Sequence, residues 1–199
     1  MPVSIRGELG PGRDVDAIVE LQSHSGIYWR FCDSAYPVES APPKAPRDGR
    51  YHRQGDDGRW YGSSCPIASW AELMRASPNV SVSQWKGDAW SFGYIQVQDL
   101  SILDLTDFST LDQLNLTWEE LRSNLWDLTQ RLAGMVWAED EVEGILAPGA
   151  PLDGHLILVL RPNVMTGSHF VGKQEMAGQS PPRYLEFLSG SIRRVIAKP

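Results

Sequence analysis

The stretch GRYHRQGDDGRWYGSSCPIASWAELMRAS, residues 49–77, predicts three elements in a fixed order. An extended basic loop leads into a short strand that ends at Tyr61, and a tight turn then leads into a helix that carries one acid. Eleven residues separate Arg50 from Tyr61, and eleven more separate Tyr61 from Glu72. This order allows three different elements to bring a guanidinium, a phenol and a carboxylate to one place.

The helix in this stretch has recognisable ends and faces. Ser64 stands where an N-cap residue is expected, and Pro66 is tolerated in a first helical turn, so the helix is expected to run to about Ala76. At helical spacing, Glu72 lies beside the small Ala68 and flanks the apolar stripe of the helix. The carboxylate is therefore expected beside the packed face, with room in front of it.

Length and composition predict one domain over residues 1–199, with its core at about 27–161. A chain of 199 residues can bury a sizeable core, and 42% of its residues are hydrophobic, with eight tryptophans among them. A disordered chain has a much lower apolar content. We therefore expect a folded chain with a helical lead-in and a C-terminal tail.

The charge distribution disfavours a nucleic-acid partner. The net charge is −7, whereas surfaces that bind nucleic acid need an excess of lysine and arginine. Residues 44–59 nevertheless hold five basic residues against three acidic ones, and residues 99–143 hold two against eleven. A locally basic loop suits a small anion such as a pyrophosphate, although an ordinary arginine-bearing loop explains the same charge count equally well.

Metal, disulfide and membrane roles find no support in the sequence. Two cysteines, Cys32 and Cys65, are too few for a disulfide framework, and no cysteine or histidine cluster has metal-ligand spacing. The first ten residues contain no apolar segment of signal-peptide length, and no run approaches the ~18 to 20 apolar residues of a membrane span. A cytoplasmic protein without a metal or cofactor is therefore expected.

The rest of the chain mixes strand and helix patterns without a regular alternation. Residues 14–22 predict a short amphipathic helix, residues 36–46 a proline-rich loop, and residues 117–136 one long helix with a capping box at its start. Strands are expected at 27–31, 80–83, 94–98, 100–105, 142–147 and 155–161, with short ordered pieces at 184–188 and 192–196. This arrangement favours the α+β class.

Four short motifs of the chain resemble those of the RES domain family. They are Tyr28-Trp29-Arg30, Gly49-Arg50-Tyr51-His52, Tyr61-Gly62-Ser63-Ser64 and Ala71-Glu72-Leu73. Members of this family are typically toxins of toxin–antitoxin pairs that degrade NAD. The resemblance covers most of residues 28–160, and it implies an ADP-ribosyltransferase-like fold in which two small packed β-sheets form a cleft for NAD. It also implies a helix-turn-helix antitoxin as partner and a homodimer.

The resemblance implies roles that the chemistry of NAD cleavage can use. Breaking the nicotinamide–ribose bond builds positive charge on the anomeric carbon, which a fixed carboxylate stabilises, and Glu72 is the candidate for this role. Tyr61 is placed to hold the ring or ribose, and Arg50 to bind the pyrophosphate, with Arg30 as second choice. His52 is a candidate ribose contact. The acceptor is either water or phosphate, and the sequence does not choose.

The chain departs from the family pattern at one position. The family serine falls in a segment that reads Ala147-Pro148-Gly149-Ala150 here, so that Gly149 replaces it. Loss of one transition-state hydrogen-bond donor costs about 10²- to 10³-fold in rate. Ser63 and Ser64 are possible substitutes, although turn and cap roles are favoured for both.

The departure leaves three hypotheses open. The first is an NAD-degrading enzyme, the second a catalytically impaired module that binds NAD or a protein partner, and the third an unrelated scaffold. The third predicts that Arg50, Tyr61 and Glu72 do not converge in space.

Overall fold

The first twenty residues form a β-hairpin, and the helix expected at residues 14–22 is wrong. The computed structural model describes residues 1–76, 90–150 and 153–176. Strands β1 (Pro2–Gly10) and β2 (Arg13–Glu20) pair antiparallel, with Gly12 at a positive φ of 70° in the turn. Along β2, Val15, Ala17 and Val19 are buried, whereas Ile18 is 67% exposed. The buried set alternates with a period of two, which is the period of a strand.

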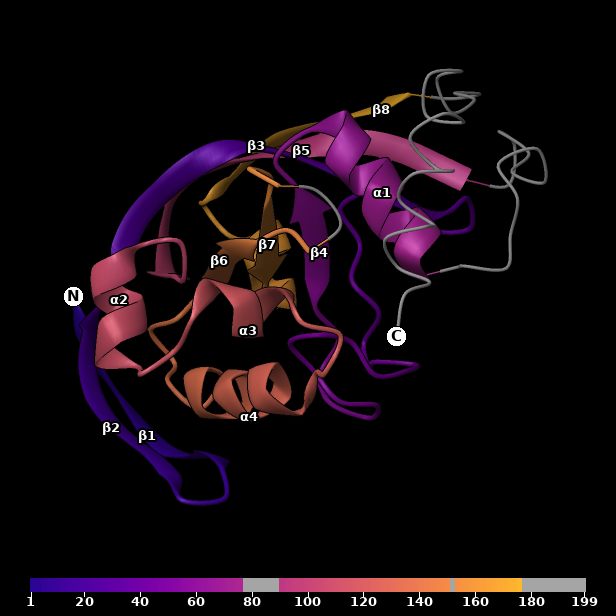
Figure 1. Cartoon of the computed structure of the whole chain (residues 1–199). Coiled ribbons are helices and arrows are strands. Elements are labelled where there is room, and N and C mark those ends of the chain that lie inside the picture. Colours follow the sequence, from indigo (N-terminus) through magenta and orange to yellow (C-terminus); the bar gives the residue numbers. More distant parts are fainter. Residues whose placement is uncertain (77–89, 151–152, 177–199) are drawn as a thin grey trace.

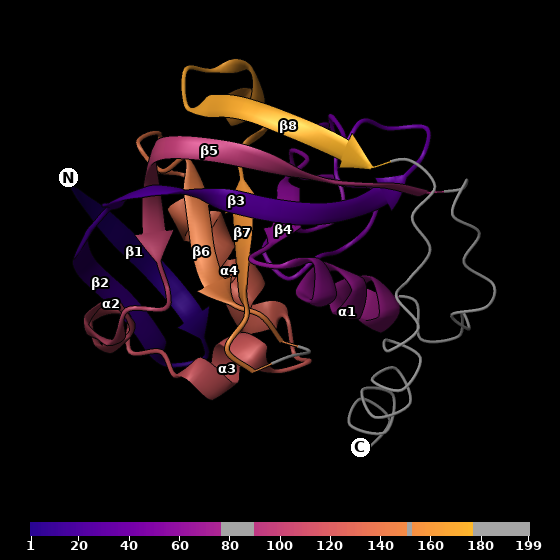
Figure 2. The same cartoon turned by 90° about the horizontal axis from the view of Figure 1, so that it is seen from above.

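Six further strands form the main sheet, and their pairings close on themselves (Figures 1 and 2). Pairing runs in the order β3, β4, β7, β6, β5, and β5 also pairs back to β3, with β8 attached outside β5. All pairs are antiparallel except β5 with β6. The strands are β3 (Gln22–Asp33), β4 (Trp60–Ser63), β5 (Trp90–Asp104), β6 (Gly144–Pro148), β7 (Leu156–Leu160) and β8 (Phe170–Met176).

The helices lie beside this sheet rather than between its strands. Figure 1 shows α3 and α4 below β6 and β7, α2 next to the β1–β2 hairpin, and α1 beside β4. The helices are α1 (Pro66–Ala76), α2 (Phe108–Gln113), α3 (Trp118–Arg122) and α4 (Asp127–Val136), with a 3₁₀ helix at Pro162–Thr166. The mixture of sheet and separate helices is α+β, as predicted.

The two faces of the sheet support two hydrophobic cores. One core joins the outer faces of β6 and β7 to the hairpin and to α2–α4, and it includes Tyr51 and Ile145. The other is enclosed by β3–β7 and includes Trp60 and Leu158. Successive residues of a strand point to opposite faces, so Trp60 faces the second core and Tyr61 packs against the first. This alternation places Tyr61 on the side of the sheet where the helices lie.

The single helix expected at residues 117–136 is two helices, because a tertiary contact interrupts it. The predicted capping box is present: the Thr117 side chain accepts from Glu120 N, and Glu120 accepts from Thr117 N. After Arg122, however, the carbonyl oxygens of Leu121 and Ser123 accept from Arg50 Nη1, and Leu125 N donates to Ser123 Oγ instead of continuing the helix. A distant arginine therefore competes with the helical hydrogen bonds.

The other strands and the loop expected from the sequence agree with the structure to different extents. The strands expected at 27–31, 142–147 and 155–161 overlap β3, β6 and β7, and the loop at 36–46 is present. The strand expected to end at Tyr61 is β4, which begins at Trp60 and runs on to Ser63. The two strands expected at 94–98 and 100–105 are one long strand, β5, and β8 was not predicted. The pieces expected at 80–83, 184–188 and 192–196 lie outside the described residues. Within the described ranges, none of the helices has the length and apolar character needed to cross a bilayer.

Candidate functional site

Arg50 lies in the loop between β3 and β4, where only 7% of its surface is exposed. Its Nη1 donates to Leu121 O and Ser123 O at 2.5 and 2.8 Å. Its Nη2 is buried and has no hydrogen-bond partner among the described residues. Burial lowers the pKa of Arg50, but a guanidinium titrates so far above neutrality that the charge remains. One edge of the guanidinium therefore holds the backbone of residues 121–123, and the other has unused hydrogen-bonding capacity.

The start and end of α4 hold this loop in place. Gln130 Nε2 donates to Gly49 O at 2.9 Å, and the indole nitrogen of Trp137 donates to Tyr51 O at 3.0 Å. Tyr51 is fully buried, and its hydroxyl has no partner among the described residues. Arg50 and Tyr51 thus each present one buried polar atom with unused hydrogen-bonding capacity.

Tyr61 is oriented by His52. The Tyr61 hydroxyl accepts from Tyr51 N at 3.1 Å and lies 2.7 Å from His52 Nδ1. His52 Nε2 lies 3.1 Å from Arg47 O, which can only accept, so Nε2 carries the proton and neutral His52 accepts from Tyr61 through Nδ1. Burial lowers the pKa of His52 and raises that of Tyr61. Tyr61 is therefore a fixed, protonated phenol, and His52 positions it.

Glu72 sits on α1, two turns into the helix, and it is half-buried. Ala68 and Ala71 on the same helix are buried, at 3% and 0% exposure, which places the packed face of α1 beside the carboxylate as expected. The helix ends at Ala76 as predicted. Its start differs, because Ser64 Oγ accepts from Leu156 N of β7, while the backbone N–H of Ala68 points to Cys65 Sγ. Cys65 therefore occupies the capping position expected for Ser64.

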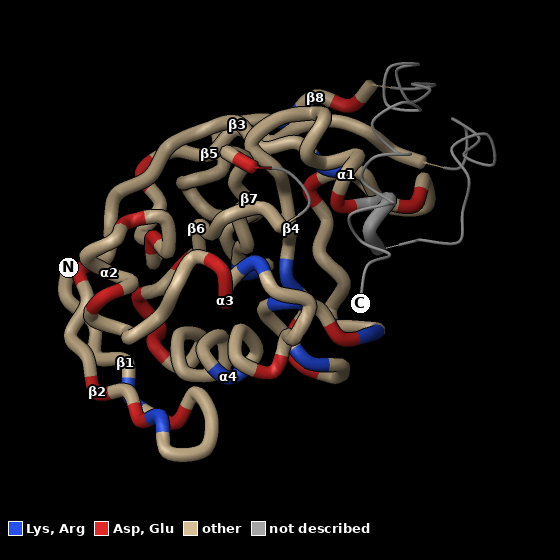
Figure 3. The backbone as a smooth tube through the Cα atoms, in the orientation of Figure 1, with Lys and Arg blue, Asp and Glu red and all other residues tan. Residues whose placement is uncertain are grey.

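Glu72 and Tyr61 both lie close enough to Arg50 for their charges to affect its pKa. Burial is the main cause of the lowered pKa of Arg50, and the charges of Glu72 and Tyr61 act against it. The Glu72 carboxylate also adds to the burial that raises the pKa of Tyr51. Figure 3 shows basic segments at β4 and the loop before it, near helices α3 and α4, which carry residues of both charges.

Arg30 and Ser63 lie on opposite sides of the sheet. Arg30 Nη1 donates to Val38 O at 3.4 Å and also to Ser40 O, and its guanidinium lies over the Trp60 ring. Trp60 faces the enclosed core, so Arg30 is on the face away from Tyr61 and holds the 36–46 loop. The structure therefore does not bring this second-choice arginine to the site. Ser63 is buried two residues after Tyr61 on β4, and so it shares the face of Tyr61.

Gly149 is glycine because its backbone lies against β7. Its N–H donates to His155 O at 2.6 Å, and a Cβ built on Gly149 would lie 2.9 Å from that same oxygen. A side chain there forces the turn after β6 to shift. The serine that the resemblance implies at this position would therefore have to displace a tight local pairing.

Replacing Gly149 with serine is expected to destabilise the fold by about 1–3 kcal/mol without raising catalytic activity, because the backbone must move to admit Cβ. Gly134, in α4, has open space around its Cβ position. The control Gly134→Ala is expected to stabilise by about 0.5–1 kcal/mol. Urea unfolding of both variants measures this, and a Gly149→Ser variant as stable as the parent would contradict the close approach.

Arg122 is a site residue that the sequence pattern missed. It ends α3, and its Nε donates to Gly149 O at 3.2 Å while Nη2 pairs with Asp153 at 2.5 Å. The positive charge of Arg122 lowers the pKa of Arg50, with a smaller effect than burial or the nearby aromatic and acidic groups. A basic residue inside the acidic stretch 99–143 was the available signal. Arg122 therefore adds a second positive charge near Arg50.

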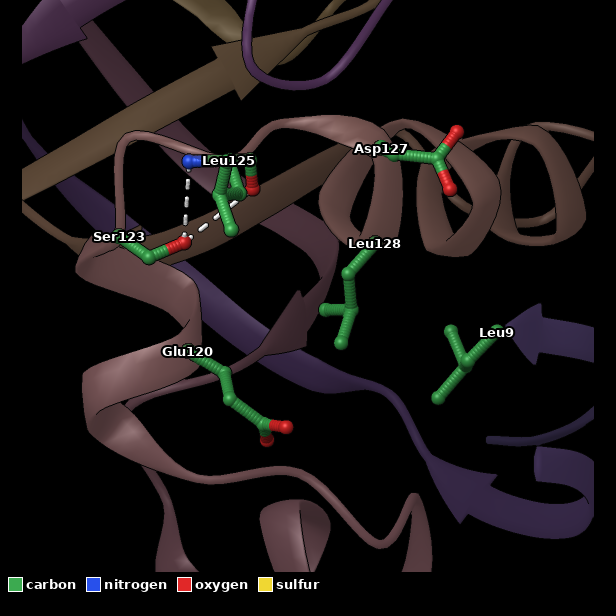
Figure 4. A pocket seen from close by; sticks show the side chains of 6 residues that line it. All are labelled: Leu9, Glu120, Ser123, Leu125, Asp127 and Leu128. Carbon is green, nitrogen blue, oxygen red and sulfur yellow. Dashed lines mark hydrogen bonds between the residues drawn. The ribbon is translucent and has the colours of Figure 1, made fainter. Parts of the chain in front are cut away.

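A cavity of about 350 Å³ has Ser123 in its lining, the residue whose carbonyl oxygen accepts from Arg50 (Figure 4). It is lined by Leu9, Glu120, Ser123, Leu125, Asp127 and Leu128. Its acids are paired, Glu120 with Arg13 at 2.6 Å and Asp127 with Arg131 at 2.7 Å. An apolar cavity with neutralised acids does not suit a pyrophosphate. Across residues 1–76, 90–150 and 153–176, no cluster of His, Cys, Asp and Glu has the geometry of a metal site.

Comparison with known proteins agrees with the motifs. The chain is 29% identical over 193 residues to the probable NAD(+) phosphorylase Rv3189 of Mycobacterium tuberculosis, and the match covers 92% of this chain and 91% of the relative. The crystal structure of the M. tuberculosis MbcT-MbcA toxin-antitoxin complex contains a similar fold, with a TM-score of 0.63 and 17% identity, covering 87% of this chain and 92% of that one. The sequence model of the RES domain matches residues 27–175. This chain belongs to the RES domain family.

Proposed function

We propose that this protein cleaves the nicotinamide–ribose bond of NAD and transfers the ADP-ribosyl group to inorganic phosphate. The observation that carries the proposal is that the charge of Glu72 acts on Arg50 and Tyr51, each of which has a buried polar atom with unused hydrogen-bonding capacity, in a chain of this family. The name of the relative, a probable NAD(+) phosphorylase, supports phosphate rather than water as the acceptor.

Glu72 supplies the electrostatic stabilisation that the reaction needs. As the bond to nicotinamide lengthens, positive charge develops on the anomeric carbon, and a fixed carboxylate lowers the energy of that state. Nicotinamide leaves as a neutral ring, so no strong general acid is required. Tyr61, held by His52 and Tyr51, presents its aromatic ring to position the substrate, and it does not act as a base because burial raises its pKa.

Arg50 and Arg122 bind different anionic groups, the pyrophosphate of NAD and the incoming phosphate. Arg50 offers a buried Nη2, which suits the pyrophosphate of NAD, since a guanidinium binds phosphate oxygens in its own plane. Arg122 lies near Arg50, its side chain is 28% exposed, and its ion pair is with the largely exposed Asp153, so it is our candidate for binding the incoming phosphate. An ADP-ribosyltransferase-like cleft, lined by Tyr61 and Glu72, would hold the nicotinamide riboside between α1 and β4.

A toxin held by an antitoxin is part of the same proposal. The fold is similar to that in a toxin–antitoxin complex, which supports a protein partner for this chain. A helix-turn-helix antitoxin and a homodimer complete the proposed assembly. Expression of the chain alone is then expected to lower cellular NAD, and co-expression with its antitoxin to restore it.

The proposal is tested by incubating the purified protein with NAD, with and without phosphate, and following the products by chromatography. We expect nicotinamide and ADP-ribose-1″-phosphate, with a rate that rises with phosphate. Replacing Arg122 with glutamine should raise the KM for phosphate by about tenfold or more, because a charge-assisted hydrogen bond contributes about 1.5–3 kcal/mol. Arg122→Lys, which keeps the charge, serves as the control.

Two outcomes would overturn parts of this assignment. Formation of ADP-ribose at a rate independent of phosphate would make water the acceptor. Binding of NAD without any release of nicotinamide would favour the impaired module, in which the glycine at position 149 has removed turnover.

A further inference from the structure

Cys65 and His155 form a thiol–imidazole pair at the start of α1. Cys65 Sγ lies 3.3 Å from His155 Nδ1, and the backbone N–H of Ala68 points at the same sulfur from 3.4 Å. Both side chains are partly exposed. The thiolate is the nucleophilic form of cysteine, and here an imidazole is in place to accept the proton while a helix N–H faces the sulfur. Neither residue has a role in the NAD reaction described above.

The second cysteine provides an internal comparison. Cys32 is buried, at 8% exposure, and its thiol donates to Tyr36 O at 3.3 Å. Burial raises the pKa of this thiol. Cys32 therefore has the setting of an inert structural cysteine, whereas Cys65 has a proton acceptor and an open side.

The pair sits at the junction between the helix that carries Glu72 and the turn that carries Gly149. Glu72 follows Cys65 by seven residues on the chain, which is about 10 Å along a helix. His155 O accepts from Gly149 N, and the next residue, Leu156, is bonded through N to Ser64 Oγ and through O to Ser64 N. A group added to Cys65 Sγ competes with the contacts that this sulfur makes with His155 Nδ1 and Ala68 N, so we expect it to shift the start of α1 relative to β7.

We propose that Cys65 is a site of covalent modification by hydroperoxides and other electrophiles, and that its modification inhibits the enzyme. The inhibition rests on the proposed NAD reaction, whereas the reactivity does not. In the reaction with a hydroperoxide, the thiol proton passes to His155 Nδ1 and the sulfur attacks the terminal oxygen, breaking the O–O bond. The sulfur is oxidised to sulfenic acid, and the leaving alkoxide or hydroxide takes the proton from the imidazolium.

The reactivity is tested on the intact protein with iodoacetamide and, separately, with hydrogen peroxide, followed by peptide mass spectrometry. We expect Cys65 to be alkylated at least tenfold faster than Cys32. In the His155→Gln variant, the alkylation rate of Cys65 should fall most of the way to that of Cys32. Equal rates at the two cysteines, or a rate at Cys65 unchanged by His155→Gln, would overturn the site whatever the protein does to NAD.

The inhibition is tested by plotting nicotinamide release against the modified fraction of Cys65. We expect activity to fall in proportion, and the Cys65→Ser variant to keep its activity under the same treatment. The Cys32→Ala variant should remain as sensitive as the parent. Full activity with a fully modified Cys65 would overturn the inhibitory role, even where the labelling rates agree with the proposal.

Discussion

Replacing Glu72 with glutamine is expected to lower the rate of nicotinamide release by about 10²- to 10³-fold. Glutamine keeps the size of the side chain and removes its charge, so the substitution removes the stabilisation of the cationic transition state. The KM for NAD should change much less, because the neutral amide still fills the same space. A steady-state assay over a range of NAD concentrations separates the two effects.

The matched control for this variant is Glu119→Gln, the same substitution at an exposed position on α3. Its activity should equal that of the parent. Thermal unfolding of both variants checks that a loss of activity is not a loss of fold. A folded Glu72→Gln protein with more than about one tenth of the parent rate would remove Glu72 from the chemistry.

Replacing Arg50 with alanine is expected to be the most destabilising of the site substitutions. It leaves the carbonyl oxygens of Leu121 and Ser123 without their donor, and each buried polar group left unsatisfied costs about 1–3 kcal/mol. The free energy of unfolding should therefore fall by about 2–5 kcal/mol, and activity should be lost. Denaturant unfolding measures the first effect.

Two further variants, one at Arg53 and one at Arg50, separate the effects of charge, folding and catalysis for Arg50. Arg53→Ala removes a neighbouring arginine whose ion pair with Asp127 is largely exposed, so its cost should be below about 1 kcal/mol. Arg50→Lys keeps the charge but cannot reach two carbonyls and an anion together. We expect it to fold with reduced stability and a raised KM for NAD, and an unchanged KM would contradict the binding role of the guanidinium.

The order of elements around residues 49–77 was predictable because it depends on local chemistry. The strand at Trp60–Ser63 and the helix that ends at Ala76 follow from residue type, proline placement and spacing. The hairpin at residues 2–20 was missed because Ile18, which is exposed, made the apolar pattern resemble that of a helix. A partly apolar outer face hides the period of a short strand.

Other features could not be predicted because they depend on contacts between distant parts of the chain. The break between α3 and α4 exists because Arg50, about seventy residues earlier, takes the carbonyl oxygens that a continuous helix would use. The return pairing of β5 to β3 joins segments on either side of the site stretch. For the same reason Arg122 was indistinguishable from a surface residue until the position of Arg50 was known.

The central claim is that Arg50, Tyr61 and Glu72 line one NAD site, and the most direct measurement is a crystal structure of the Glu72→Gln variant soaked with NAD. We expect the nicotinamide riboside against Tyr61 and the substituted side chain, with the pyrophosphate on Arg50 Nη2. NAD bound in the cavity between Leu9 and Leu128 instead, with Tyr61 and Arg50 untouched, would contradict the account.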